Sequence, residues 1–252
     1  MHGYRAWKQP QAQGYVVMRR HSGSYKPRSM PPDTPMRPFS DRATAGRELG
    51  LLLQLYRGRS DIAVLALPRG GVPVAFEVAH RLAAPLDVMI VRKLGTPGKS
   101  ELAMGAIAAG GIVVSNERSR QDRDPTQMET ILATERAELQ RRECLYRAGR
   151  NALELADHMA ILVDDGAATG ASMQAAVRAV RKLGAREVVV ALPVASVEAH
   201  EKLREEVDRL VCISTPAAFT AVSCWYDDFS EIDDAQVRDL LTRASQDQAA
   251  DS

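Results

Sequence analysis

Two adjacent carboxylates, Asp164 and Asp165, stand where an apolar run ends and a loop of small residues begins. The run 159-MAILV-163 predicts a buried strand, and residues 170–183 predict a helix. The loop between them holds small and hydroxylated residues: Gly166, Ala167, Ala168, Thr169, Gly170, Ala171 and Ser172. Unpaired N–H groups at a helix N-terminus bind phosphate, and carboxylates accept hydrogen bonds from hydroxyls or hold hydrated Mg²⁺. The stretch favours a sugar phosphate as ligand.

A plainer interpretation is that the two acids only end a strand and that Thr169 or Ser172 caps the following helix. The acids, the loop of small residues and the strand-to-helix position occur together here. That combination favours the ligand site over the plainer interpretation.

Three cationic side chains lie in two other loops. Arg69 belongs to 68-PRGG-71, which follows the apolar run 62-IAVLALP-68. Lys93 and Lys99 belong to residues 93–101, a polar loop rich in glycine and proline. The stretch 98-GKS-100 is not a nucleotide-binding P-loop, because G-x-x-x-x-G-K-[ST] would need glycine where Lys93 stands.

These loops need a scaffold, and the alternation of strands and helices predicts one. Apolar runs predict buried strands, and amphipathic patterns between them predict helices. The expected strands are 62–68, 86–92, 159–163, 187–195 and 209–214, with two short strands around Gly110-Gly111, and the expected helices begin near residue 40 and cover 72–82, 126–149, 170–183 and 196–206. We therefore predict a doubly wound α/β fold, with a mostly parallel sheet and helices on both faces.

Composition divides the chain into four parts. Residues 1–38 are rich in proline and basic, with seven Lys or Arg against Asp33, and are expected to form a flexible tail. The alternative is an arm that binds RNA or a membrane surface. Residues 39–215 are expected to form the core, 216–245 a small C-terminal hood, and 246–252 a second flexible tail.

Charge and cysteine content indicate the compartment and the kind of partner. The net charge of +1 gives no reason to expect nucleic acid or an anionic membrane as main partner. The three cysteines are far apart and form no CxxC pair, which argues against a disulfide framework or a zinc site. No apolar run approaches the roughly 20 residues that span a bilayer. We expect a soluble, cytoplasmic protein.

The stretch 161-ILVDDGAATGASM-173 closely resembles the phosphoribosyl-diphosphate (PRPP) binding motif of type I phosphoribosyltransferases. The resemblance extends over about residues 40–245, because 67-LPRGGVPVA-75, 91-VRKLGTPGKSELAMGAI-107 and 224-CWYDDF-229 look like segments of a little-characterised bacterial branch of that family. It implies a Mg²⁺-dependent transfer of the 5-phosphoribosyl group from PRPP to a nucleobase-like nitrogen acceptor, with release of pyrophosphate. It also implies a homo-oligomer, most simply a dimer.

The resemblance assigns roles to the residues of the three loops. Asp164 and Asp165 would contact the ribose hydroxyls, directly or through Mg²⁺. A mobile loop over 93–101 would close over the reacting centre and bring Lys93 and Lys99 to it, so that these lysines and Arg69 would be catalytic. The 5′-phosphate would be bound by Ala167, Ala168, Thr169, Gly170, Ala171 and Ser172, and pyrophosphate by Arg69, Gly70, Gly71, Arg92 and Lys93. Glycine in that second loop would adopt backbone geometry forbidden to other residues.

The acceptor is where this chain departs from the resembling enzymes. Hypoxanthine-guanine phosphoribosyltransferases have an acid at the position of Ala168, and alanine cannot act as a base. In the hood, Trp225 or Tyr226 would stack on a heteroaromatic base, and Asp227 or Asp228 would accept from its N–H groups. The alternative is that these aromatic residues pack the hood onto the core.

Two other functions are compatible with the same motif. One is a non-catalytic regulator that senses PRPP or a nucleotide and binds RNA through its basic tail. The other is phosphohydrolase or phosphorylase chemistry on a sugar phosphate. Retention of both acids, Arg69, Lys93 and Lys99 favours the transferase, because a sensor can lose its loop cations.

Overall fold

The computed structural model describes residues 16–18, 38–94, 105–115 and 125–250. Its centre is a six-stranded sheet in the order β1-β9-β8-β7-β2-β3. The strands are β1 (Val16–Met18), β2 (Ile62–Ala66), β3 (Leu86–Val88), β7 (Met159–Val163), β8 (Glu187–Val194) and β9 (Arg209–Ser214). All pair in parallel except β1, which is antiparallel to β9. The predicted doubly wound fold is confirmed.

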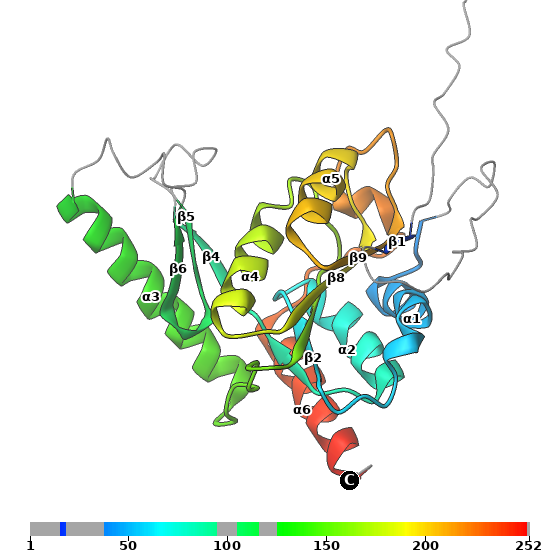
Figure 1. The fold of residues 1–252 in the computed structure, drawn as a ribbon, viewed down its shortest axis with the longest axis horizontal. Coiled ribbons are helices and arrows are strands. Elements are labelled where there is room, and N and C mark those ends of the chain that lie inside the picture. Colours follow the sequence, from blue (N-terminus) through cyan, green and yellow to red (C-terminus); the bar gives the residue numbers. More distant parts are fainter. Residues whose placement is uncertain (1–15, 19–37, 95–104, 116–124, 251–252) are drawn as a thin grey trace, which may run out of the picture.

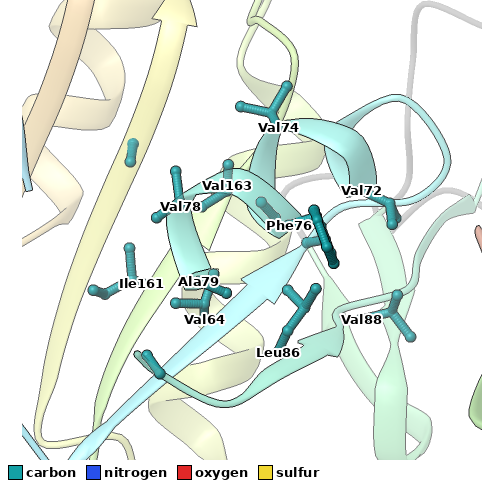
Figure 2. Close-up of a cluster of buried hydrophobic side chains, with 14 of the residues drawn as sticks. Val64, Val72, Val74, Phe76, Val78, Ala79, Leu86, Val88, Ile161 and Val163 are labelled. Carbon is teal, nitrogen blue, oxygen red and sulfur yellow. The ribbon is translucent and has the colours of Figure 1, made fainter. Parts of the chain in front are cut away.

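Both faces of the sheet are buried because successive side chains of a strand point to opposite sides. In β2, Ile62 and Val64 join one hydrophobic cluster, whereas Ala63 and Leu65 join another. The first cluster faces α1 (Arg42–Leu52), α2 (Gly71–Leu82) and α6 (Asp234–Ala250), and the second faces α4 (Ala171–Lys182) and α5 (Val197–Glu206) (Figure 1). Figure 2 shows α2 placing its valines and Phe76 over the strands. Burial on both faces explains why the strands are apolar throughout.

The order of the parallel strands reverses at one point of the sheet. From β2 the chain moves outward to β3, and from β7 it moves the opposite way through β8 to β9. Ligands of doubly wound sheets bind where the order reverses, beyond the carboxyl ends of the strands. Here that point lies between β2 and β7, whose last residues, Ala66 and Val163, are paired.

The predicted strand 86–92 is wrong, because the chain leaves the main sheet in its middle. Met89 N–H donates to Ala66 O, whereas Ile90 O accepts from Ala109 N–H, next to a second sheet. That sheet is antiparallel and contains β4 (Val91–Leu94), β5 (Gly105–Ala108) and β6 (Ile112–Ser115), followed by α3 (Pro125–Arg147). Met89 and Ile90 are both buried, so the apolar run carries no sign of the break.

The ends of the chain differ from expectation where the structure describes them. Val16–Met18, in the expected flexible tail, pair with Arg209–Val211 along the edge of the sheet. The other residues of 1–37 lie outside the described part. α6 continues to Ala250, through most of the second expected tail. β-branched Val16 and Val17 suit an edge strand. Residues 246–250 are three polar residues and two alanines, which form no apolar period that would predict a helix.

The segment expected to be the hood divides into two parts. α6 packs against α2 and places Val237, Leu241 and Ala244 in the main core cluster. The remainder, 216–233, contains the 3-10 helix η4 (Val222–Trp225) and lies beside the start of α1, where Phe39 N–H donates to Trp225 O. In the described part of the chain, no helix combines the length and apolarity that crossing a membrane requires.

Candidate functional site

Asp164 and Asp165 lie at the switch point, against the loop that follows β2. A Cβ atom added to Gly70 would lie 2.1 Å from Oδ2 of Asp165. One added to Gly71 would lie 2.8 Å from Val163 O. Neither position has room for a side chain, so the two loops approach each other as closely as glycine allows. The acid pair and the Arg69 loop therefore form one site.

The reason we expected for these glycines is wrong. Gly70 has φ −60° and ψ −33°, which any residue can adopt, and Gly71 begins α2. What the loop requires at Gly70 is space beside Asp165, not a forbidden backbone angle. The unusual backbone feature of the loop is the cis peptide bond between Pro68 and Arg69.

Asp165 is fixed by residues that sequence reasoning missed. Arg42 Nε donates to Asp165 Oδ2 at 2.9 Å, and the two side chains are only 9% and 14% exposed. Arg42 Nη1 donates to Ser230 O at 2.8 Å, and its guanidinium lies 3.8 Å from the centre of the Phe229 ring. In the sequence, Arg42 follows a helix-capping aspartate, a position that is typical of the start of a surface helix. Among the described residues it is the only buried Lys or Arg.

Charge on the acid pair is unevenly distributed. Burial, and then the charge of Asp165, raise the pKa of Asp164 well above its usual range. Burial also raises the pKa of Asp165, but the hydrogen bond and charge of Arg42 oppose that rise. Asp164 Oδ1 accepts from Asp165 N–H at 2.9 Å. The environment therefore favours protonation of Asp164 over protonation of Asp165.

The predicted phosphate loop is tied to the end of β8. Ala167 N–H donates to Val194 O, Ser196 N–H donates to Ala167 O, and Ser196 Oγ donates to Ala168 O at 2.6 Å. Gly170 has φ +73°, a left-handed angle that favours glycine, and α4 begins immediately after it. At this N-cap position glycine offers no side-chain acceptor to the helix. Ala171 N–H makes a long hydrogen bond of 3.4 Å to Thr169 Oγ1. The N–H groups that follow it and the positive end of the helix dipole are available to an anion.

The predicted cations are not all placed together. Arg69 pairs with Glu231, and their side chains are 37% and 79% exposed. Arg92 Nε pairs with Glu135 of α3 at 2.6 Å. The backbone of Lys93 belongs to β4 and pairs with Ala106, so β4 continues into the range 93–101 that we expected to be a loop. Residues 95–101, Lys99 among them, lie outside the described part of the chain.

Tyr226 does not have the role that we expected, because its ring is buried. It packs against Phe39 and Phe229 at centroid distances of 5.5 and 5.1 Å, and its hydroxyl donates to Asp165 O at 2.6 Å. Burial raises the pKa of this hydroxyl, which keeps it a donor. Tyr226 thus supports the acid pair, as the alternative of aromatic packing predicted. Trp225 is half-buried, and Asp227 and Asp228 are exposed.

Comparisons with known proteins agree with this geometry. A model of the phosphoribosyl transferase domain matches residues 49–228. Two Mycobacterium tuberculosis proteins, from strains CDC 1551 and H37Rv and each named "Putative phosphoribosyl transferase", are 43% identical over 214 residues, or 84% of this chain and 48% of theirs. The chain thus spans about half the length of these relatives. The crystal structure of TT1426 from Thermus thermophilus is 44% identical, covers 82% of this chain and 99% of that chain, and has a TM-score of 0.74.

Proposed function

Because the chain belongs to the phosphoribosyl transferase family, we propose that it transfers the 5-phosphoribosyl group of PRPP to a nucleobase-like nitrogen acceptor and releases pyrophosphate. The observation that supports this most directly is the acid pair between two anion-binding loops at the switch point of the sheet. PRPP has the matching order of groups: a 5′-phosphate, a ribose with vicinal hydroxyls, and a pyrophosphate.

Each loop then has one part of the substrate to hold. The N-terminus of α4, whose N-cap is a glycine, holds the 5′-phosphate. Asp165 accepts hydrogen bonds from ribose hydroxyls, and the guanidinium of Arg69 holds pyrophosphate. In the reaction, the bond between the anomeric carbon and the pyrophosphate oxygen breaks and its electron pair leaves with pyrophosphate. The acceptor nitrogen forms the new bond and gives up its proton to solvent.

Mg²⁺ is compatible with these residues as a substrate-borne ion. Among the described residues, no group of three or more His, Cys, Asp or Glu side chains could hold a metal by itself. Mg²⁺ usually needs only one or two carboxylates when substrate phosphates complete its shell. Each acid has one oxygen engaged, Asp165 Oδ2 by Arg42 and Asp164 Oδ1 by Asp165 N–H, so the second oxygen of either acid would hold the ion. When bound, Mg²⁺ would neutralise charge on the leaving pyrophosphate.

Pyrophosphate release from Mg²⁺·PRPP, measured across purines, pyrimidines and simple heteroaromatic acids or amides, tests the proposal. We expect release with one acceptor, and none with the Asp164→Asn variant as blank. That variant is a better blank than a double substitution, because Asp165 also anchors Arg42. Tight Mg²⁺·PRPP binding without release with any acceptor would favour the sensor instead. Phosphate release from ribose 5-phosphate without pyrophosphate would favour the hydrolase.

Replacing Glu231 by glutamine is expected to tighten pyrophosphate binding. Glu231 pairs with Arg69 and must be displaced before Arg69 can bind an anion. Exposed pairs contribute roughly 0.2–1 kcal/mol, so the Kd for Mg²⁺·pyrophosphate should fall about two- to fivefold at most. Calorimetric titration measures it, with Glu205→Gln as a control that removes the same charge from an exposed position on α5. If the Kd fell equally in Glu231→Gln and Glu205→Gln, the tighter binding would not come from freeing Arg69 from its ion pair.

A further inference from the structure

We propose that Arg42 is a positioning residue of the phosphoribosyl site, which holds the Asp165 carboxylate in place for ribose hydroxyls and ties it to Phe229 and Ser230. The inference rests on the proposed function and adds a residue to it. We call Arg42, Phe229 and Ser230 the Arg42 clasp.

The clasp uses the planar shape of the guanidinium as well as its charge. Nε points to Asp165 Oδ2, Nη1 points to Ser230 O, and the Phe229 ring lies against the guanidinium. The hydrogen bonds are directed toward two different chain segments from one rigid group. A lysine ammonium has charge but no such fork, so it cannot satisfy both partners in this geometry. The arrangement is therefore specific for arginine.

The consequence for Asp165 is a fixed orientation. Its Oδ2 is bound by Arg42 and lies beside Gly70, where an added Cβ would come within 2.1 Å. Its main-chain oxygen accepts from the Tyr226 hydroxyl. Oδ1 is thus the oxygen that Asp165 presents to a ligand. A carboxylate whose rotation is already restricted loses less entropy when it binds a hydroxyl.

The clasp also offsets the charge of the acid pair. Two adjacent carboxylates beside a polyphosphate would repel it, and a half-buried carboxylate without a partner is costly. Arg42 lies next to Asp165 as a buried counter-ion. The acid pair can then remain close to the loop that carries Arg69 without an uncompensated charge between them.

The members of the clasp come from outside the part of the chain that defines the family. The family model matches residues 49–228, whereas Arg42 precedes that range and Phe229 and Ser230 follow it. The two flanks meet at the site, since Arg42 Nη1 donates to Ser230 O. Next to this contact, the first flank also pairs with the end of the matched range, where Asp228 N–H donates to Ser40 O. The residues before and after the matched domain thus jointly position one of its acids.

Binding of separate substrate parts distinguishes positioning from a purely structural role. In the full chain we would measure Kd for Mg²⁺·PRPP, ribose 5-phosphate and Mg²⁺·pyrophosphate, with Arg42→Lys and Arg42→Met variants. We expect Arg42→Met to weaken both ribose ligands by about 30-fold and Arg42→Lys by about 10-fold. Binding of Mg²⁺·pyrophosphate, which has no ribose, should stay within about twofold. Arg47→Lys, on the same helix in an exposed pair with Glu77, is the control and should change nothing.

Unchanged ribose binding in Arg42→Lys, measured well below its melting temperature, would overturn the proposal even if stability falls. So would an equal loss for pyrophosphate and for the ribose ligands, since that indicates general damage. If the unmodified protein bound neither ribose ligand, that result would instead contradict the proposed function and the inference that rests on it.

Discussion

An Asp164→Asn variant is expected to melt at a higher temperature than the unmodified protein and to bind Mg²⁺·PRPP about 100-fold more weakly. Burial and the neighbouring Asp165 charge disfavour ionised Asp164 in the empty site. Asparagine has nearly the same shape, carries no charge, and keeps an oxygen that can accept from Asp165 N–H. It thus removes an unfavourable ionisation but also the anion that the ligand needs. A gain of 1 kcal/mol corresponds to about 2–4 °C for a chain of this size.

The stability difference should depend on pH in a defined direction. An aspartate whose pKa is raised by folding stabilises the folded state while it is protonated, completely so below the usual pKa of about 4. That contribution is lost as the pH rises through the raised pKa of Asp164. Asparagine does not titrate, so the variant has no such contribution to lose. Its advantage in melting temperature should therefore be smallest near about pH 4 and grow toward about pH 8, as scanning calorimetry can measure.

Asp165→Asn is the matched control, because it removes the same charge from the next residue. Here the buried Arg42 loses its counter-ion, so the melting temperature at neutral pH should fall instead of rising. Both variants should lose PRPP binding. If Asp164→Asn also lowered the melting temperature at neutral pH, the assignment of the proton to Asp164 would be incorrect.

The parts of the site that could be predicted from sequence are those encoded locally. The strand 159–163, the acids after it, the small-residue loop and the following helix are contiguous, so one stretch contains both the scaffold and the chemistry. The place of this loop, beyond the carboxyl end of a parallel strand, then follows from the alternation of strands and helices, whereas the order of the strands in the sheet does not. By the same logic the sequence offers Ser40 or Asp41 as the cap of the first helix, and the structure shows Asp41, whose side chain accepts from Thr44 N–H.

What could not be predicted depends on contacts between distant segments. Arg42 and Asp165 are 123 residues apart, and an arginine near a helix start has no pattern that marks it as buried. Tyr226 is an aromatic residue of the kind that stacks on bases. Only its packing against Phe39 and Phe229 shows that its ring is buried instead. Gly70 was expected to be needed for its backbone angles, yet its φ is ordinary and its neighbour Asp165 is the reason for glycine.

Replacing Gly70 by alanine is therefore expected to damage the site through Asp165, not through the backbone of its own loop. The new methyl group would lie 2.1 Å from Asp165 Oδ2, an oxygen that Arg42 already holds at 2.9 Å. Either the carboxylate leaves Arg42 or the loop after β2 moves away. A displacement of about 1 Å at a reacting site can cost about 100-fold in kcat/KM, and overpacking of this kind costs about 1–3 kcal/mol of stability.

A double-mutant cycle separates the two ways in which alanine could act. The three atoms nearest to the added Cβ all belong to the Asp165 carboxylate, at 2.1, 2.8 and 3.3 Å. In an Asp165→Ala background these atoms are gone, so Gly70→Ala should then cost little stability and leave Mg²⁺·pyrophosphate binding nearly unchanged. An equal cost in both backgrounds would show that the methyl group is excluded by something other than Asp165. If Gly70→Ala abolished pyrophosphate binding in both backgrounds, the methyl group would be colliding with the ligand itself. Pyrophosphate would then approach the Gly70 backbone directly.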